Sequence, residues 1–417
     1  MPQTVLSFHV KVERKVGYSS LISEQMDIAY QRLQSGWIPN NNDERNPIQD
    51  QKITSVTDNY IFINRYFSKS QVFWVFFVRL LSFSNPLLEI MGLLSSLKFK
   101  RVKIVPEVYK DFLRFQSALI QSNPLVSVII PTLNRYEYLK DVLTDLEKQY
   151  YTHFEVIVCD QSEPVNEAFY GGWKLNIQLI KQEEKALWLA RNRCINQSKG
   201  DYILLFDDDS RVEKNWITNH LKGLDRFQVP ISAGVTHTIV GGGVGNKDKY
   251  FHLSDVFDTG NAMVKREVFA KAGLFDRQFE KQRMGDSEFG IRSLLGGFLI
   301  VANPYAKRIH LKVESGGLRQ MGSWDAVRPK NLLAPRPIPS VLYLIRKYHS
   351  TNEAILYLIK NIPQSYVPYR LKGNKKAKLL ILLIFPFLSL LAILSVRKSW
   401  NLSTVKLRQG PLIESLD

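Results

Sequence analysis

Between residues 125 and 210, short apolar runs alternate with segments of helical periodicity. Three of the runs read VSVIIP, FEVIVCD and DYILLFDDD, and residues 177–180 form a weaker fourth. Helical segments at 135–149 and 187–197 lie between them. Buried runs that alternate with helices are typical of a mostly parallel sheet with helices on both faces, so the pattern predicts an α/β domain.

Polar residues follow three of these runs at the points where the predicted strands end. They are Thr132–Arg135, Asp160–Ser162 and Asp207–Asp209. Because ligands of parallel sheets bind at the carboxyl ends of the strands, we expect the three groups to meet at one edge of the sheet. This expectation rests on the strand pattern and on no resemblance to other proteins.

Residues 1–123 precede this region and are expected to form an N-terminal extension of unknown role. Within it, residues 72–97 are strongly apolar, but Arg79, Pro86 and Glu89 interrupt them. A membrane-spanning helix needs about 20 apolar residues in a row. We therefore expect a buried or membrane-surface helix pair here rather than a span.

The predicted α/β domain covers residues 124–325, and residues 326–417 are expected to form a helical C-terminal region. Residues 379–396 are uncharged and lie between the basic sequences KKAK and RK. This stretch is just long enough to span a bilayer, although Pro386 lies in its middle. A hairpin or an interfacial helix held by the basic flanks is the alternative, and either form predicts association with a membrane.

The net charge of the chain indicates which kinds of partner it could bind. The 417 residues include 56 Lys and Arg against 39 Asp and Glu, which gives a formal net charge of +17. Such a surplus fits nucleic acid, an anionic membrane surface or phosphorylated substrates. Between Ala354 and Ile413 the sequence has ten basic residues and no acidic one, which favours the membrane. No helix-turn-helix, zinc or RNA-binding motif is recognisable, so we expect no nucleic-acid partner.

The two cysteines and the N-terminal sequence bear on metal sites, disulfides and secretion. Cys159 and Cys194 lack a CxxC spacing, so the sequence predicts two buried apolar side chains rather than a zinc cluster or a disulfide scaffold. The N-terminal sequence MPQTVLSFHVKVERK has no charged-then-apolar signal pattern, and we expect no secretion.

The sequence Asp207-Asp208-Asp209 is the sharpest candidate for chemistry. Adjacent like charges are unfavourable unless a cation lies among them, and Mg²⁺ or Mn²⁺ prefers oxygen ligands that it shares with substrate phosphates. Taken alone, these residues fit both a metal–diphosphate site and a solvated turn or helix cap. Asp160 likewise fits a nucleobase contact or an ordinary turn, and Arg191 fits a phosphate contact or a surface position.

Two further candidates lie later in the chain. Asp286 and Glu288 belong to the polar cluster GDSEFGIR, where one carboxylate would serve as a general base for an attacking hydroxyl. Ordinary surface acids are the alternative. His310 ends the segment AKRIH; imidazole is a frequent metal ligand, but a single histidine is more often structural.

Seven motifs follow one another along the chain: Val126–Arg135, Phe154–Asp160, Ala190–Arg193, Gly200–Asp209, Gly260–Met263, Phe275–Asp276 and Gly285–Arg292. In this order, they resemble the motifs of the inverting glycosyltransferases of family 2, which have the GT-A fold. The resemblance covers just under half of the chain and implies a Rossmann-like, mostly parallel sheet. The chain departs from the family pattern at two places: Asp160-Gln161-Ser162 replaces a frequent Asp-Asp-Gly-Ser, and Ala186 replaces a frequent glycine.

The resemblance implies a role for each candidate residue. Asp209 would be the metal-ligating aspartate for Mn²⁺ or Mg²⁺, and His310 would be a late metal or diphosphate contact. Asp286 would be the catalytic base, with Glu288 and Asn261 on the acceptor side. The donor-binding residues would be Pro131, Thr132, Asn134, Arg135, Asp160, Arg191, Asp207 and Asp208.

The implied activity is metal-dependent, inverting transfer of a sugar from a nucleotide-diphosphate sugar to a hydroxyl of a glycan or lipid-linked acceptor. We expect it to serve cell-surface polysaccharide synthesis, with the catalytic domain on the cytoplasmic side of a membrane. One alternative is a non-catalytic membrane scaffold that keeps the same fold. Another is a nucleotidyltransferase, whose first loop would normally be Gly-rich with a Lys or Arg, where this chain has PTLNR.

Two further segments belong to this interpretation. Glycines at 241–243 and 245 suggest a segment that closes over donor or acceptor, with an ordinary surface loop as the alternative. Residues 315–319, which read SGGLR, follow His310 and extend the late motif of the resemblance.

Overall fold

The computed structural model describes residues 17–39, 54–238, 245–313, 331, 333–371 and 373–416. The glycines at 241–243 and the motif at 315–319 lie outside the described residues. The chain divides into two compact units, one of Met1–Leu113 with Lys249–Leu253 and one of Arg114–Asp248 with Ser254–Asp417. The boundaries predicted near residues 123 and 325 stay predictions.

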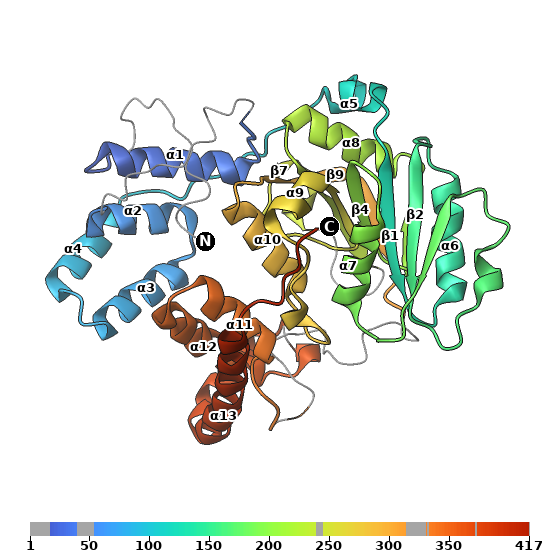
Figure 1. The fold of residues 1–417 in the computed structure, drawn as a ribbon. Helices are drawn as coiled ribbons and strands as arrows, with labels where there is room; N and C mark the ends of the chain where they lie inside the picture. Colours follow the sequence, from blue (N-terminus) through green and yellow to red (C-terminus); the bar gives the residue numbers. More distant parts are fainter. Residues whose placement is uncertain are drawn as a thin grey trace. The chain divides into compact units, whose positions relative to one another are not determined.

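Helices make up most of the regular structure described in the N-terminal unit (Figure 1). Ser20, Ser55, Ser68 and Asn85 cap its four helices through their side-chain oxygens. The apolar residues 72–97 fall on two short helices joined by a tight connection. The elements are α1 (Leu21–Ser35), α2 (Val56–Tyr66), α3 (Lys69–Leu81), α4 (Pro86–Ser96) and the short strand β7 (His252–Leu253).

The larger unit is built on a mixed sheet in the order β3-β2-β1-β4-β8-β6-β9-β5. Strands β3, β2, β1 and β4 are parallel, as predicted, while β8 runs antiparallel to its neighbours and β5 runs antiparallel to β9. The strands are β1 (Val126–Thr132), β2 (Phe154–Asp160), β3 (Ile177–Lys181), β4 (Tyr202–Phe206), β5 (Ser210–Val212), β6 (Ile231–Thr238), β8 (Asn261–Lys265) and β9 (Ile300–His310).

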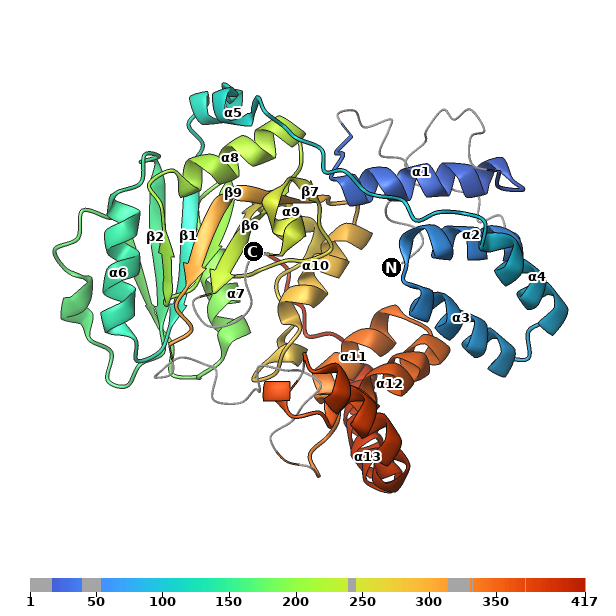
Figure 2. The same cartoon turned by 180° about the vertical axis from the view of Figure 1, so that it is seen from behind.

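Helices cover both faces of this sheet (Figures 1 and 2), so the predicted α/β class is confirmed. Helices α7, α9 and α10 pack on one face through a core that includes Ile129, Trp188 and Phe289. Cys159 and Cys194 are free and buried in that core, which confirms their prediction. The helices are α5 (Ala118–Gln121), α6 (Tyr136–Glu147), α7 (Leu187–Gln197), α8 (Trp216–Phe227), α9 (Arg266–Ala272) and α10 (Gly285–Leu295).

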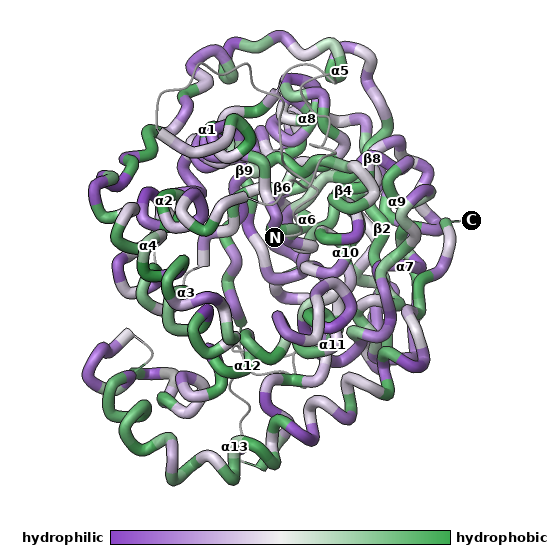
Figure 3. Tube along the Cα trace, turned by 90° about the vertical axis from the view of Figure 1, so that its left-hand side faces the viewer, coloured by the Kyte–Doolittle hydropathy of each residue, from purple (hydrophilic) through white to green (hydrophobic). Residues whose placement is uncertain are grey.

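Three helices form the C-terminal region: α11 (Pro339–Tyr348), α12 (Thr351–Ser365) and α13 (Lys375–Gln409). Among the described residues, α13 is the one helix that is long and apolar enough to cross a membrane by length and composition, and its central part is coloured hydrophobic in Figure 3. After α13 the chain returns to the sheet domain, where the Leu412 N–H donates to Asp276 and the Leu274 N–H donates to the carbonyl of Glu414.

Short 3-10 helices complete the described secondary structure. They are Phe112–Arg114, Glu167–Tyr170, Asn246–Lys249, Arg277–Phe279 and Tyr369–Leu371.

Candidate functional site

A cleft of about 530 Å³ opens in the larger unit at the carboxyl ends of β1 and β4. Its walls also include the end of β9, the start of α10 and the loop that precedes α10. Residues from two of the three groups predicted to meet at one sheet edge, Thr132–Arg135 and Asp207–Asp209, therefore line the cleft, whereas Asp160–Ser162 do not. Of the predicted site residues, those that line the cleft are Pro131, Thr132, Arg135, Arg191, Asp207, Asp208, Asp209, Asp286 and His310.

Asp207 lies between two buried arginines. Its Oδ1 is 2.8 Å from Nη2 of Arg191, and its Oδ2 is 2.6 Å from Nη1 of Arg308. Burial works to raise the pKa of Asp207, but the charges of Arg308 and Arg191 outweigh it and hold that pKa well below its usual value. Asp207 is therefore a carboxylate at neutral pH, available to a cation at the edge of the cleft.

Asp208 has a different environment. Its Oδ1 is 2.9 Å from Nη1 of Arg135, and its Oδ2 accepts a 2.9 Å hydrogen bond from the Thr132 hydroxyl. Burial, reinforced by the charge of Asp209, raises the pKa of Asp208 to about 6 although Arg135 opposes the shift. The three consecutive aspartates are thus held by different partners.

Strand pairing brings His310 to the aspartates. In the antiparallel pair of β5 and β9, Ser210 lies opposite His310, and the Leu311 N–H donates to the carbonyl of Asp209. As a result, Nε2 of His310 is 3.1 Å from Oδ1 of Asp209. One ligand atom from each of Asp207, Asp209 and His310 lies within 4.8 Å of the others. Two carboxylates and an imidazole suit Mn²⁺ and are compatible with Mg²⁺.

Arg308 was not predicted, yet it organises this end of the cleft. It is 2 % exposed, and besides Asp207 it contacts Asp258 through Nη2 at 3.1 Å. A signal was present in the sequence, because Arg308 precedes His310 by two residues and side chains two apart point to the same face of a strand. Gly260 packs so closely against this pair that a Cβ there would overlap both Arg308 and Asp207.

Arg191 has buried donors that suit an anionic ligand. Its side chain is 2 % exposed; Nη2 donates to Asp207 and, at 3.3 Å, to the carbonyl of Thr259. Within the described part of the chain, Nε and Nη1 have no hydrogen-bond partner. Unpaired buried donors are costly, so these N–H groups at the cleft wall fit a phosphate ligand.

Asp286 lies in the first turn of α10, where its Oδ1 accepts from the N–H of Ser287 at 2.7 Å. Burial raises the pKa of Asp286, and the neighbouring charge of Asp258 adds to the rise while Arg191 opposes it. A carboxylate with a raised pKa at the cleft wall has the properties of a general base.

Two predicted donor residues lie outside the cleft lining. The carboxylate of Asp160 ends β2 but accepts hydrogen bonds from the hydroxyls of Tyr136 at 2.6 Å and Tyr170 at 2.8 Å. Asn134 is exposed in a left-handed conformation with φ of 53°, and its N–H donates to Ser162. Direct donor contacts of Asp160 and Asn134 stay predictions.

Asn261, predicted on the acceptor side, is completely buried. Its Oδ1 accepts from Nε1 of Trp216 at 2.8 Å and lies 3.1 Å from Nε2 of His220. Its amide nitrogen donates to the carbonyls of Val235 and Ala306. This side chain thus joins β8 to α8, β6 and β9 and does not line the cleft.

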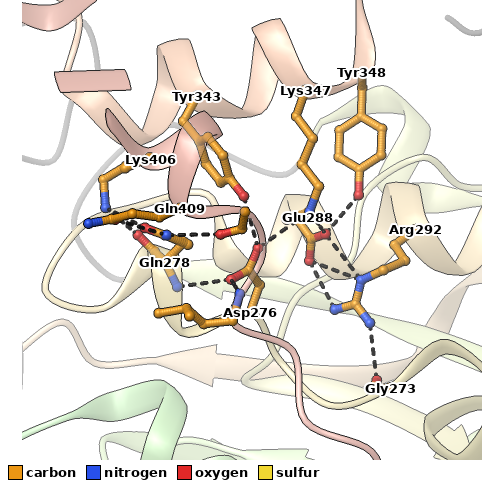
Figure 4. Close-up of polar contacts among 12 residues, drawn as sticks. Gly273, Asp276, Gln278, Glu288, Arg292, Tyr343, Lys347, Tyr348, Lys406 and Gln409 are labelled. Carbon is orange, nitrogen blue, oxygen red and sulfur yellow. Dashed lines mark hydrogen bonds and ion pairs between the residues drawn. The ribbon is translucent and has the colours of Figure 1, made fainter. Parts of the chain in front are cut away.

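Glu288 is also fully buried and does not line the cleft; Figure 4 shows its polar contacts. Its carboxylate pairs with Arg292 at 2.9 Å and Lys347 at 2.9 Å and accepts from the Tyr348 hydroxyl at 2.7 Å. These contacts join α10 to α11. The position of Glu288 supports the helix that carries Asp286 rather than exposing an acid to an acceptor.

The two departures from the family pattern contact each other. Oε1 of Gln161 accepts the N–H of Ala186 at 2.7 Å, and Ala186 has an ordinary φ of −143° that requires no glycine. The next donors of α7, the N–H groups of Trp188 and Leu189, are bound by the carboxylate of Glu280, which also lines the cleft. Glu280 thus caps α7 from a distance of more than 90 positions in the sequence, which no local motif indicates.

Residues 127–282 match the family model Glycosyl transferase family 2. Glycosyltransferase GlyA of Streptococcus pneumoniae is 24% identical over 247 residues, which are 57% of this chain and 30% of that protein. The amylovoran biosynthesis glycosyltransferase AmsB of Erwinia amylovora is 31% identical over 110 residues, 24% of this chain and 36% of AmsB. This chain thus spans about a third of the length of either relative.

Among solved structures, TarS of Staphylococcus aureus in complex with UDP-GlcNAc aligns with a TM-score of 0.42 and 18% identity. That alignment covers 59% of this chain and 72% of the TarS chain. The family match includes the ends of β1 and β4 at the cleft, whereas Asp286, Arg308 and His310 lie beyond it. Residues 127–282 therefore match a glycosyltransferase domain of family 2.

Proposed function

We propose that the protein transfers a sugar from a nucleotide-diphosphate sugar to a hydroxyl group of a glycan or lipid-linked acceptor, with inversion at the anomeric carbon. The observation that carries this proposal is the shared cleft: Asp207, Asp209 and His310 form a cation site beside the unpaired donors of Arg191, and Asp286 lines the same space. A cation site next to a phosphate site and a base is what such a transfer requires.

Asp207, Asp209 and His310 would hold Mn²⁺ or Mg²⁺. When bound, the ion supplies positive charge that neutralises the charge developing on the departing nucleoside diphosphate. Arg191 binds the same diphosphate through its free N–H groups, and Arg308 keeps Asp207 ionised and oriented. Thr132, Arg135 and Asp208 hold the floor of the donor site at the end of β1.

Asp286 accepts the proton of the acceptor hydroxyl as its oxygen attacks the anomeric carbon. The bond from that carbon to the diphosphate breaks on the opposite face, so the configuration inverts and no covalent enzyme intermediate is needed. Glu288 acts as a positioning residue, because its pairs with Lys347 and Arg292 fix the helix on which Asp286 lies.

The cellular setting follows from the C-terminal region. The uncharged residues 379–396 of α13 are flanked by lysines and arginines of the same helix. Basic residues beside an apolar segment favour the cytoplasmic side of a membrane. We therefore place the catalytic domain on that side, acting on a membrane-bound acceptor in polysaccharide assembly. The similarity to AmsB, an amylovoran biosynthesis glycosyltransferase, supports this setting.

A panel of nucleotide sugars with and without Mn²⁺ tests the donor site. A ligand that binds only the folded protein raises its melting temperature, and we expect such a rise to require the ion. Incubation with the stabilising donor and candidate acceptors should then release nucleoside diphosphate. Absence of metal-dependent hydrolysis or transfer across the panel would favour the non-catalytic scaffold, whereas pyrophosphate release from a nucleoside triphosphate would favour a nucleotidyltransferase.

Asp286→Asn tests the assignment of the base. We expect this variant to keep the metal-dependent thermal shift and to lose transfer by about 100-fold or more. Asp255→Asn is the matched control, because Asp255 is an exposed aspartate of the same unit outside the cleft. Near-normal turnover by Asp286→Asn would show that another group takes the proton.

A further inference from the structure

The hairpin formed by α3, α4 and the connection 82–85 exposes an unusual amount of apolar surface. Phe83, in the connection, is 98% exposed, and Leu87 in the first turn of α4 is 71% exposed. Phe77, Leu81, Met91 and Leu94 each expose more than half of their surface. Figure 3 shows hydrophobic colours along these helices. A contiguous apolar surface of this kind marks a binding face rather than ordinary exposure.

We propose that this hairpin inserts into the surface of a lipid bilayer that contains anionic lipids. The proposal does not depend on the chemistry of the cleft, and it adds a second membrane contact to the one proposed for α13. Its neutralised acid, its internally bonded connection and its basic border favour lipid over a protein partner.

The hairpin contains one acidic residue, and that residue is neutralised inside. Glu89 is 1 % exposed, its Oε1 lies 2.8 Å from Nη2 of Arg79, and its Oε2 accepts from the Tyr60 hydroxyl of α2 at 2.7 Å. Gly92 lets α4 approach the ring of Tyr60, since a Cβ at this position would lie 2.8 Å from a ring carbon. The polar side of α4 thus packs against α2, and its apolar side stays outward.

Three of the four backbone donors of the connection are bonded to α3. The N–H groups of Ser82, Phe83 and Ser84 donate to carbonyls in the last turn of α3. Oδ1 of Asn85 accepts the first N–H groups of α4, from Leu87 at 3.0 Å and from Leu88. A bilayer offers no water to unpaired backbone groups, so a tip with internally bonded donors is suited to a lipid environment.

Basic residues border the apolar surface. Between residues 68 and 103 the chain has six Lys and Arg and a single acid, Glu89. Lys98, Lys100, Arg101 and Lys103 follow α4 directly and are all exposed. A polybasic segment beside an apolar tip is attracted to anionic lipid head groups.

The dimensions fit shallow insertion. At a rise of 1.5 Å per residue, α3 and α4 are about 20 Å and about 16 Å long, shorter than a hydrocarbon core of about 30 Å. The hairpin therefore enters the bilayer from one side and does not cross it.

A fluorescent probe on the hairpin separates this contact from any binding by α13. Phe83→Cys and Met91→Cys, in the full chain, are labelled with an environment-sensitive dye. Cys159 and Cys194 are buried and should not react in the folded protein. Tyr150→Cys is the control, since Tyr150 is 72% exposed in the other unit. Vesicles of phosphatidylcholine with phosphatidylglycerol are then added, and quenchers on the lipid acyl chains report the depth of the dye.

We expect dye emission at positions 83 and 91 to shift to shorter wavelength and to be quenched from the acyl chains, with no change at position 150. If the protein sediments with the vesicles but both hairpin probes keep their emission in water, the bilayer contact lies elsewhere and the proposal is wrong. It is equally wrong if the protein does not bind vesicles, or if the hairpin probes respond to protein concentration without lipid, which would identify a second copy of the chain as the partner.

Discussion

Gly260 offers a direct test of the arginine–aspartate arrangement in the cleft. An ideal Cβ at this position would lie 1.9 Å from Nη1 of Arg308 and 2.2 Å from Oδ2 of Asp207. These two atoms form the 2.6 Å ion pair at the cation site. Because non-bonded heavy atoms rest at about 3.5 Å or more, Gly260→Ala must push both partners away by more than about 1 Å.

The loss in the free energy of unfolding depends on whether the Arg308–Asp207 ion pair survives the substitution. If the surroundings yield and the pair survives, overpacking costs about 1–3 kcal/mol of the free energy of unfolding. If the pair opens, Asp207 keeps Arg191 and Arg308 keeps Asp258, so the loss stays below the about 3–5 kcal/mol expected when a buried charge is left without any partner. In either case Asp207 moves relative to Asp209 and His310, so we expect the affinity for Mn²⁺ and nucleoside diphosphate to fall at least about tenfold, equivalent to about 1.4 kcal/mol.

Urea unfolding measures the first quantity, and titration calorimetry with Mn²⁺ and nucleoside diphosphate measures the second. Gly171→Ala is the control, because Gly171 has φ of −82° and its nearest neighbour would lie at an ordinary 3.5 Å. A Gly260→Ala protein that binds metal and nucleotide within twofold of the parent would refute the inferred role of the Arg308–Asp207 pair.

The remaining predictions address the base, the ion and the fold around them. Because Asp286 must be ionised to accept a proton and burial raises its pKa, transfer should decline as pH falls through a value above about 4, the ordinary aspartate pKa; a pH–rate profile that stays flat down to pH 4 would contradict this. Chelation by EDTA should abolish transfer and added Mn²⁺ should restore it, while His310→Ala should raise the Mn²⁺ concentration for half-activity about tenfold or more; unchanged Mn²⁺ dependence would remove His310 from the ligand set. Asp276→Ala should lower the free energy of unfolding by about 2–4 kcal/mol, because this fully buried carboxylate accepts from Leu412 N–H and pairs with Lys347; in urea unfolding, a loss no larger than that of Asp255→Ala would show that the C-terminal tail contributes little.

Sequence patterns were sufficient for the parallel half of the sheet, β3-β2-β1-β4, and for much of the cleft. Apolar runs marked β1, β2 and β4, and the rule that ligands meet parallel strands at their carboxyl ends brought Asp207–Asp209 to the correct edge. The family motifs then brought Asp286 and His310 to the same cleft, and the structure places them there. Local periodicity and ordered motifs carry this information because each depends on neighbouring residues.

Residues whose roles depend on contacts between distant parts of the sequence could not be predicted from local patterns. Arg308 reaches Asp207 because β9 pairs with both β5 and β6, and Glu280 reaches the start of α7 through a loop of the later chain. Asn261 stands at the expected motif position, but burial in the core gives its side chain four structural contacts. A polar residue in a motif can therefore serve the fold rather than the ligand, and only three-dimensional packing separates the two.

The packing of α12 against α13 limits how the C-terminal helix can enter a membrane. The rings of Tyr366, just past α12, and Phe385 of α13 lie 6.2 Å apart. Ten residues of α13 precede Phe385, a length of about 15 Å, which is about half of a hydrocarbon core of about 30 Å. While that contact holds, the part of α13 that precedes Phe385 is too short to cross the hydrocarbon core on its own.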